Sequence, residues 1–177
     1  NNLTNALKGQ AKTQGNWGEM ILENILEYSG LVKNREYFLQ ESYTDEAGRR
    51  KQPDVIIKYP GDRHIIVDSK VSLTAYERFA NEEDPEAQKL YLAEHIRSIK
   101  SHIDGLSLKE YDNVEKSLDF VMLFVPIEPA FMTAIHFDQQ LWSYAYKKRI
   151  LLISPTNLIA ALKMVADIWK REHQNAN

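Results

Sequence analysis

Three residues whose types can do chemistry lie in two short apolar segments. Asp54 opens the segment DVIIKY at 54–59, and Asp68 and Lys70 lie near the end of HIIVDSKV at 64–71. Carboxylate oxygens are ligands for hard divalent cations, and an ammonium group can contact a phosphate oxygen or an attacking water. If the chain brings them together, these residue types predict phosphodiester chemistry assisted by Mg²⁺ or Mn²⁺.

The residues between the two segments predict that they form a hairpin. The tripeptide PGD at 60–62 is a strong reverse-turn signal. With the turn centred on its glycine, Asp54 lies directly opposite Asp68, with Cβ atoms about 4.5–5.5 Å apart. Because side chains alternate across a strand, Asp54, Asp68 and Lys70 then project from one face. A one-residue shift in register would separate the carboxylates, so the metal site depends on this pairing.

The two carboxylates create a physical problem that a cation resolves. Side by side, Asp54 and Asp68 repel each other, and at the edge of an apolar sheet they are poorly solvated. A divalent cation removes both penalties, and Lys70 can then contact the phosphate or the water. The alternative stays open that all three are solvated residues at strand ends, because a D-x-K triplet alone has little specificity.

The remaining sequence predicts the elements that position this hairpin in a mixed α/β domain. Apolar residues at steps of three and four indicate amphipathic helices, and apolar runs bounded by turn residues indicate strands. Both hairpin strands are apolar on both faces, which predicts a sheet covered on both sides. The helices are expected at about 17–28, 72–79, 92–106 with an end at Gly105, 107 onward, 129–147 and 155 onward. The strands are expected at 37–44, 54–59, 64–71, 119–125 and 150–153, with a turn at 45–51.

Composition and charge exclude several classes of protein. The chain has 177 residues, no cysteine and a net charge of −3. The lack of cysteine excludes disulfide scaffolds, thiolate zinc sites, iron–sulfur clusters and a cysteine nucleophile. No apolar run approaches the ~20 residues of a membrane-spanning helix, so we expect a soluble, cytoplasmic domain. Because the net charge is negative, any contact with phosphates must come from a local basic patch.

Two histidines and one glutamate have alternative interpretations. His95 and His102 share one helix face but lie seven residues apart, ~10.5 Å along the axis, which is too far for one metal ion. We therefore expect partly buried or interface histidines. Glu128 follows a central strand, so it either faces the same cleft as the hairpin carboxylates or is a helix-start carboxylate.

The order of elements and motifs resembles a known superfamily. A helix, a strand, PD at the head of a second strand and D-x-K at the end of its hairpin partner form the pattern of the PD-(D/E)xK nucleases. Within that superfamily the chain closely resembles the RmuC family of bacterial DNA recombination proteins from Gly15 onward. The segments that carry this resemblance are GNWGEMILENILEYSGL at 15–31, Gln40, QPDVII at 52–57, VDSKVSLTAY at 67–76, HIDGLSLKEY at 102–111, DFVMLFVPIEPAF at 119–131, SPTNLIAALKMVADIW at 154–169 and QNAN at 174–177.

The resemblance implies a restriction-endonuclease-like core and a metal-dependent nuclease site. It implies that Asp54, Asp68 and Glu19 hold Mg²⁺ or Mn²⁺ and that Ser69 adds its backbone carbonyl. Lys70 would position water or stabilise charge on the phosphorane. An alternative stays open for Glu19, namely a solvated glutamate that is favoured at this position by the helix dipole.

The resemblance also implies DNA, duplex or branched, as the partner, with no small-molecule cofactor. Arg49, Arg50, Lys51 and Lys109 are candidates to contact it, and the alternative for the first three is a solvated turn. Full-length members carry an N-terminal coiled coil through which they can self-associate, in some cases with a membrane anchor. We therefore expect an extension over residues 1–14 that ends an upstream helix, and one excised domain over 15–177. A competing hypothesis is a catalytically idle nuclease fold that binds DNA structures or partner proteins.

Overall fold

The computed structural model describes residues 11–39, 43–44, 50–51, 54–69, 71–107 and 120–176, with only the backbone described at 11–16, 43–44 and 50–51. The elements are α2 (Ala11–Glu27), β1 (Tyr37–Leu39), β2 (Tyr43–Thr44), β3 (Arg50–Lys51), β4 (Val55–Tyr59), β5 (Arg63–Asp68), α3 (Thr74–Asn81), α4 (Pro85–Ser107), β6 (Val121–Phe124), α5 (Glu128–Phe137), α6 (Leu141–Tyr146), β7 (Ile150–Ile153) and α7 (Pro155–Ala176).

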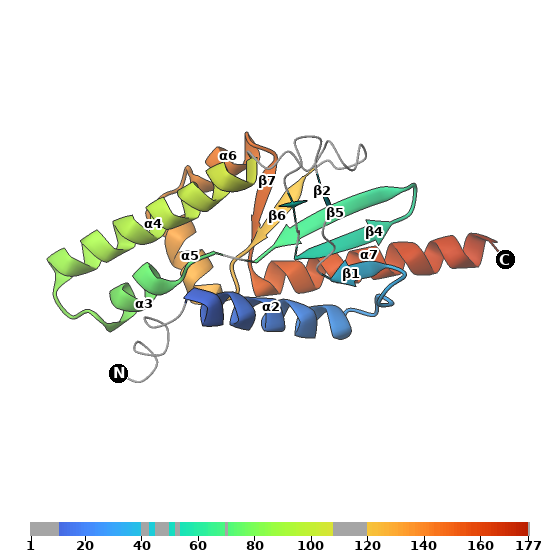
Figure 1. Ribbon diagram of the computed structural model, residues 1–177, viewed down its shortest axis with the longest axis horizontal. Coiled ribbons are helices and arrows are strands. Elements are labelled where there is room, and N and C mark those ends of the chain that lie inside the picture. Colours follow the sequence, from blue (N-terminus) through green and yellow to red (C-terminus); the bar gives the residue numbers. More distant parts are fainter. Residues whose placement is uncertain are drawn as a thin grey trace.

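The main sheet is mixed, as the sequence predicts. Its strands lie in the order β1-β4-β5-β6-β7 (Figure 1). Neighbours are antiparallel among β1, β4 and β5, whereas β6 and β7 run parallel to β5. The carboxyl ends of the three parallel strands meet at one edge, which is where open α/β sheets bind ligands. Asp68 is the last residue of β5 and therefore lies at this edge.

Helices cover both faces of the main sheet, which confirms the prediction from its apolar strands. On one face Ile56 and Ile66 share a core with α4, α5 and α6. On the other face Val55, Ile57 and Val67 share a second core with α2 and α7. Figure 1 shows α2 and α7 along one side of the sheet and α4 along the other. Successive residues of the hairpin strands therefore enter different cores, as their alternating side chains require.

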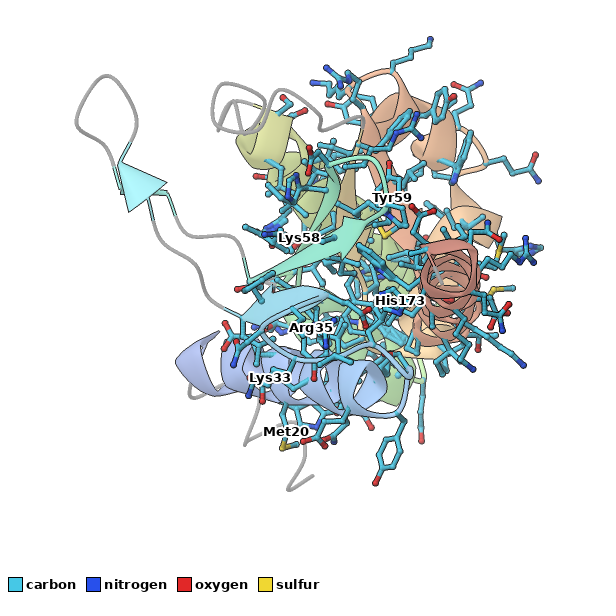
Figure 2. All side chains as sticks on the ribbon, turned by 90° about the vertical axis from the view of Figure 1, so that its right-hand side faces the viewer. Met20, Lys33, Arg35, Lys58, Tyr59 and His173 are labelled. Atoms are coloured by element: carbon cyan, nitrogen blue, oxygen red, sulfur yellow. The ribbon has the colours of Figure 1, made fainter. Side chains whose placement is uncertain are left out.

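The turn predicted at 45–51 is too long, because its last two residues form a strand. Arg50 and Lys51 in β3 pair antiparallel with Thr44 and Tyr43 in β2. Charged side chains do not prevent this pairing, since each residue still offers a backbone N–H and C=O. In Figure 2 this two-stranded sheet lies apart from the main sheet.

The predicted helix end at Gly105 is also wrong. Helix α4 continues through this exposed glycine to Ser107. A glycine inside a helix costs about 1 kcal/mol relative to alanine. Burial of Ile103 and Leu106 on either side of it, at 0 % and 3 % exposure, offsets that cost.

The single helix predicted at 129–147 is two helices. Helix α5 ends at Phe137, and Asp138 has an extended backbone with φ −122° and ψ 94°. The Asp138 carboxylate accepts a hydrogen bond from the Gln140 N–H at 3.0 Å, which stabilises the break. The new direction of the chain buries Leu141 completely in the core.

The last helix begins as predicted. Pro155 is its first residue, and the Ser154 hydroxyl accepts a hydrogen bond from the Asn157 N–H at 3.4 Å. Further along, the Trp169 indole N–H donates to the Lys58 carbonyl at 2.9 Å and holds α7 against β4. No helix in the described part of the chain is long and apolar enough to cross a bilayer.

His95 is a fully buried histidine between α4 and α5. Its Nε2 donates to the Ala130 carbonyl at 3.0 Å, and its ring lies 5.4 Å from that of Tyr76. Its Nδ1 has no hydrogen-bond partner among the described residues. Burial lowers the pKa of His95, and the hydrogen bond to Ala130 only partly opposes this effect. The ring is therefore held in its neutral form.

We predict that His95 makes the protein less stable in mild acid. A folded-state pKa below the unfolded value means that protonation favours unfolding, so the contribution is complete above about pH 6.5 and is lost as pH falls below it. His95→Gln keeps a donor for Ala130 but does not titrate. Urea unfolding between about pH 7 and pH 5 should show a smaller loss of free energy in this variant. The exposed His136→Gln is the control, and equal losses in wild type and His95→Gln would contradict the prediction.

Candidate functional site

The register of the hairpin agrees with the turn-centred prediction. Val55 pairs with Val67, and Tyr59 pairs with Arg63. The turn contains Gly61 with φ +92°, a left-handed conformation that glycine adopts without a steric penalty. Asp54 directly precedes the paired part of β4, so this register places it opposite Asp68.

Asp54 closes the open end of the hairpin. Its side chain is buried, with 4 % exposure. One of its carboxylate oxygens, Oδ2, accepts hydrogen bonds from the Ser69 N–H at 2.7 Å and from the Ser69 hydroxyl at 3.1 Å. Hydrogen bonds to an ionised carboxylate are among the stronger ones in proteins. They fix Asp54 against the residue that directly follows Asp68.

Asp68 is held by a histidine of helix α4. The carboxylate is completely buried, and its Oδ1 lies 3.0 Å from His102 Nε2 on α4. Since a carboxylate accepts, the imidazole N–H donates. The His102 side chain is 23 % exposed, which confirms the expected partly buried histidine, whereas its bond to Asp68 was not predicted. One sequence feature could have indicated this bond: His102 is a polar residue beside the apolar stripe through which α4 packs on the sheet.

Gly18 brings α2 close to the same point. A Cβ added at this glycine would lie 3.1 Å from the Ser69 carbonyl oxygen and 3.5 Å from the Pro126 side chain. The lack of a side chain therefore permits the close approach of helix and strand end. The next residue, Glu19, is partly exposed and lines the same small pocket as Asp54. The structure thus brings Glu19 to the hairpin, through a close approach at Gly18 that was not predicted from the sequence.

Several predicted site residues lie outside the described residues. These include Lys70, Arg49 and Lys109. Arg50 and Lys51 are described only as the backbone of β3. The roles assigned to these five residues therefore stay predictions.

The donor types around the hairpin suit a hard cation. Glu19, Asp54, Asp68 and the Ser69 carbonyl offer only oxygen, as Mg²⁺ and Mn²⁺ prefer. Within the described ranges, however, no three His, Cys, Asp or Glu side chains are grouped so that they could hold one metal ion. The Asp54 and Asp68 carboxylates instead accept hydrogen bonds from Ser69 and His102. These bonds use Oδ2 of Asp54 and Oδ1 of Asp68, one oxygen of each carboxylate.

Glu128 is a carboxylate at the start of a helix, which is one of the two alternatives expected from the sequence. It is the first residue of α5, and its Oε1 accepts a hydrogen bond from the Thr156 N–H at 3.0 Å in the first turn of α7. Burial raises the pKa of Glu128, but hydrogen bonds from Thr156 and Ser154 outweigh burial and hold the pKa below its ordinary value. Glu128 therefore joins the start of α5 to the start of α7.

Comparison with known proteins gives consistent matches. The model described as the RmuC family matches residues 1–177. A DNA recombination protein RmuC homolog of Pseudomonas aeruginosa is 48 % identical over 178 residues, covering 99 % of this chain and 39 % of that protein. One from Neisseria meningitidis serogroup A is 49 % identical over 182 residues, covering 99 % and 31 %, and DNA recombination protein RmuC of Escherichia coli K12 is 45 % identical over 178 residues, covering 99 % and 38 %. The chain thus spans well under half the length of these relatives. No solved structure is detectably similar to it.

Gly18→Ala and Gly105→Ala form a matched pair that tests the close approach of α2. Alanine is favoured over glycine inside a helix by about 1 kcal/mol, and a Cβ at Gly105 meets no heavy atom within 4 Å. We expect Gly105→Ala to raise the free energy of unfolding by up to ~1 kcal/mol. Gly18→Ala should lower it, because the new Cβ presses on the Ser69 carbonyl. Urea unfolding measures both, and stabilisation by both substitutions would show that the contact is not restrictive.

A double-mutant cycle tests the bond between His102 and Asp68. His102→Ala should lower the free energy of unfolding by about 2 kcal/mol, because a buried carboxylate loses a donor. In an Asp68→Asn background the same substitution should cost less, since a neutral amide is less expensive to bury. Urea unfolding of the four proteins gives the coupling energy, with exposed His136→Ala as control. If the losses of the two single variants add up to the loss of the double variant within about 0.3 kcal/mol, the bond contributes nothing to stability.

Proposed function

Because the chain belongs to the RmuC family, whose model matches residues 1–177, we propose that it is a DNA-processing domain acting in recombination. The similarity to proteins named DNA recombination protein RmuC supports this role. The proposed activity is metal-dependent hydrolysis of DNA phosphodiester bonds within a PD-(D/E)xK-like core. The proposal concerns this domain, since the relatives are more than twice as long.

One observation carries the proposal: the hairpin register places Asp54 opposite Asp68 at the carboxyl edge of the parallel strands. Two carboxylates buried this close together are costly unless hydrogen bonds or a cation compensate for their lost solvation and their mutual repulsion. Glu19 lines the same pocket as Asp54, and the Ser69 carbonyl faces α2 at Gly18. Four oxygen-bearing residues, one from α2 and three from the open end of the β4–β5 hairpin, thus support one proposed site.

Each residue has a specific part in the proposed reaction. Asp54, Asp68, Glu19 and the Ser69 carbonyl would hold Mg²⁺ or Mn²⁺. When bound, such a cation supplies Lewis-acid polarisation of a phosphodiester oxygen and lowers the pKa of bound water. In this proposal Lys70 orients the attacking water or stabilises charge on the phosphorane.

DNA would reach the site through a local basic patch, because the net charge of −3 gives no general attraction. Arg49, Arg50, Lys51 and Lys109 are the proposed phosphate contacts. Affinity that depends on such contacts falls steeply with salt concentration. Duplex and branched DNA both present the required phosphates.

The second candidate function is an idle nuclease fold that binds DNA structures or partner proteins. The observation that favours it is that each carboxylate already accepts a hydrogen bond from the protein, Asp54 from Ser69 and Asp68 from His102. These bonds hold both side chains without a cation. Metal-dependent cleavage of DNA therefore separates the two candidates.

We predict that Mn²⁺ stabilises the domain through Asp54 and Asp68. Thermal unfolding at about 100 times the Kd should reflect ~2.7 kcal/mol of added stability, a rise of several degrees in Tm. Asp54→Asn combined with Asp68→Asn should abolish the response. Asp84→Asn, an exposed aspartate between α3 and α4, is the matched control and should respond like wild type. Equal Tm curves with and without Mn²⁺ would remove the metal site.

Cleavage assays then test hydrolysis itself. Linear duplex, branched and single-stranded DNA are incubated with the wild-type protein and Mn²⁺, and Lys70→Ala should reduce cleavage to background. Exposed Lys163→Ala is the matched control. Metal binding without cleavage of any substrate would favour the idle fold. Cleavage that persists in Lys70→Ala would assign the reaction to another site or to a contaminant.

A further inference from the structure

The end of the sheet opposite Asp54 and Asp68 carries a second surface with its own chemistry. We call it the aromatic rim and define it by Tyr59, Phe120, Trp142 and Tyr146. These residues come from the end of β4, the residue before β6, and helix α6. Figure 2 looks onto this end of the molecule, with Tyr59 on the side of the hairpin toward α7. The aromatic rim shares no residue with the proposed nuclease site.

A hollow of about 400 Å³ adjoins the aromatic rim at Tyr59 and Phe120. Its floor is apolar and is formed by partly exposed Ile65, Met122 and Leu151 on adjacent strands. Tyr59 and Phe120 stand at its edge. A concave apolar surface bordered by rings fits a flat, ring-bearing ligand better than a rounded aliphatic one.

Three rings of the aromatic rim lie in a row, of which Trp142 and Tyr146 are stacked and Phe120 is tilted against Tyr146. The centroids of Trp142 and Tyr146, one helical turn apart on α6, are 4.9 Å apart with planes inclined by 17°. The Phe120 ring lies 5.3 Å from that of Tyr146. Trp142 and Tyr146 are 44 % and 47 % exposed, so their rings still offer area for stacking. Exposed, prealigned rings are a typical platform for nucleobases.

Basic side chains accompany these rings. The Arg63 guanidinium lies 5.7 Å from the centroid of the Tyr59 ring. His64 and Arg149 line the hollow, and no acidic side chain is among the described residues that line it. A protein partner would need only the apolar floor. Aromatic rings combined with basic side chains instead match a ligand that has both bases and phosphates.

We propose that the aromatic rim binds single-stranded DNA. Bases stack on Trp142, Tyr146 and the ring at the edge of the hollow, while phosphates lie beside Arg63 and Arg149. Duplex DNA keeps its bases paired and cannot use the stacking platform, so the single strand is the preferred form. The aromatic rim lies at the start of β5, and Asp68 lies at its end, ~16 Å away at 3.3 Å per residue.

Fluorescence anisotropy tests this proposal, with EDTA present so that metal-dependent cleavage plays no part. The probe is a labelled oligothymidylate of about 12 nucleotides at low salt. Wild type should bind it at least ~10-fold more tightly than a duplex of equal length. Trp142→Ala combined with Tyr146→Ala should weaken binding roughly 5- to 100-fold, since each stacked base is worth ~1–3 kcal/mol. Tyr28→Ala removes a still more exposed ring, directly after the end of α2, and should change nothing.

Photo-crosslinking keeps the test independent of whether the double variant folds. The same oligonucleotide with 5-iododeoxyuridine is irradiated with wild-type protein, and crosslinked peptides are identified by mass spectrometry. Crosslinks to the aromatic rim support the proposal. Crosslinks confined to residues near Asp54, or equal affinity of wild type and the folded double variant, overturn it. Self-association that the double substitution abolishes, without DNA binding, would instead assign the surface to a second copy of the chain.

Discussion

The hydrogen bonds from Ser69 to the Asp54 carboxylate are the interaction on which the rest of the site depends. They join the beginning of β4 to the residue that follows β5, so the open end of the hairpin cannot fray. With that end closed, the register that pairs Val55 with Val67 also holds Asp54 opposite Asp68. Because a shift by one residue would exchange the two cores, the apolar side chains and this bond select the same register.

Burial removes the two carboxylates from water at a cost in free energy, so each needs a hydrogen-bond donor from the protein. A carboxylate removed from water must find donors, and Asp54 finds them in Ser69 while Asp68 finds one in His102. The bond to Asp54 closes the hairpin itself, whereas the bond to Asp68 ties helix α4 to the sheet edge. Gly18 lets α2 approach the Ser69 carbonyl from a further element. Oxygen-bearing groups are thus concentrated at one edge of the sheet, where the cation is proposed to bind.

The two ends of the β4–β5 hairpin have opposite chemistry. Buried acids lie at its open end, whereas rings and basic side chains surround its turn. A net charge of −3 conceals this separation, since it averages acidic and basic surfaces. A surface that binds single strands at one end and a proposed phosphodiester site at the other would suit a domain that processes DNA in recombination.

The sequence by itself determined the strands of the main sheet, the turn between β4 and β5, the opposed aspartates and the covering of both sheet faces, because hydrophobic period and turn residues are local properties. It did not predict β3, which lies in a segment expected to be a turn. It did not predict that α4 continues through Gly105 or that the chain breaks at Asp138, since burial of distant side chains decides such points. Only the tertiary structure decided that His102 meets Asp68. These residues are 34 positions apart, and the packing of a helix on a sheet, which no local pattern encodes, brings them within hydrogen-bond distance.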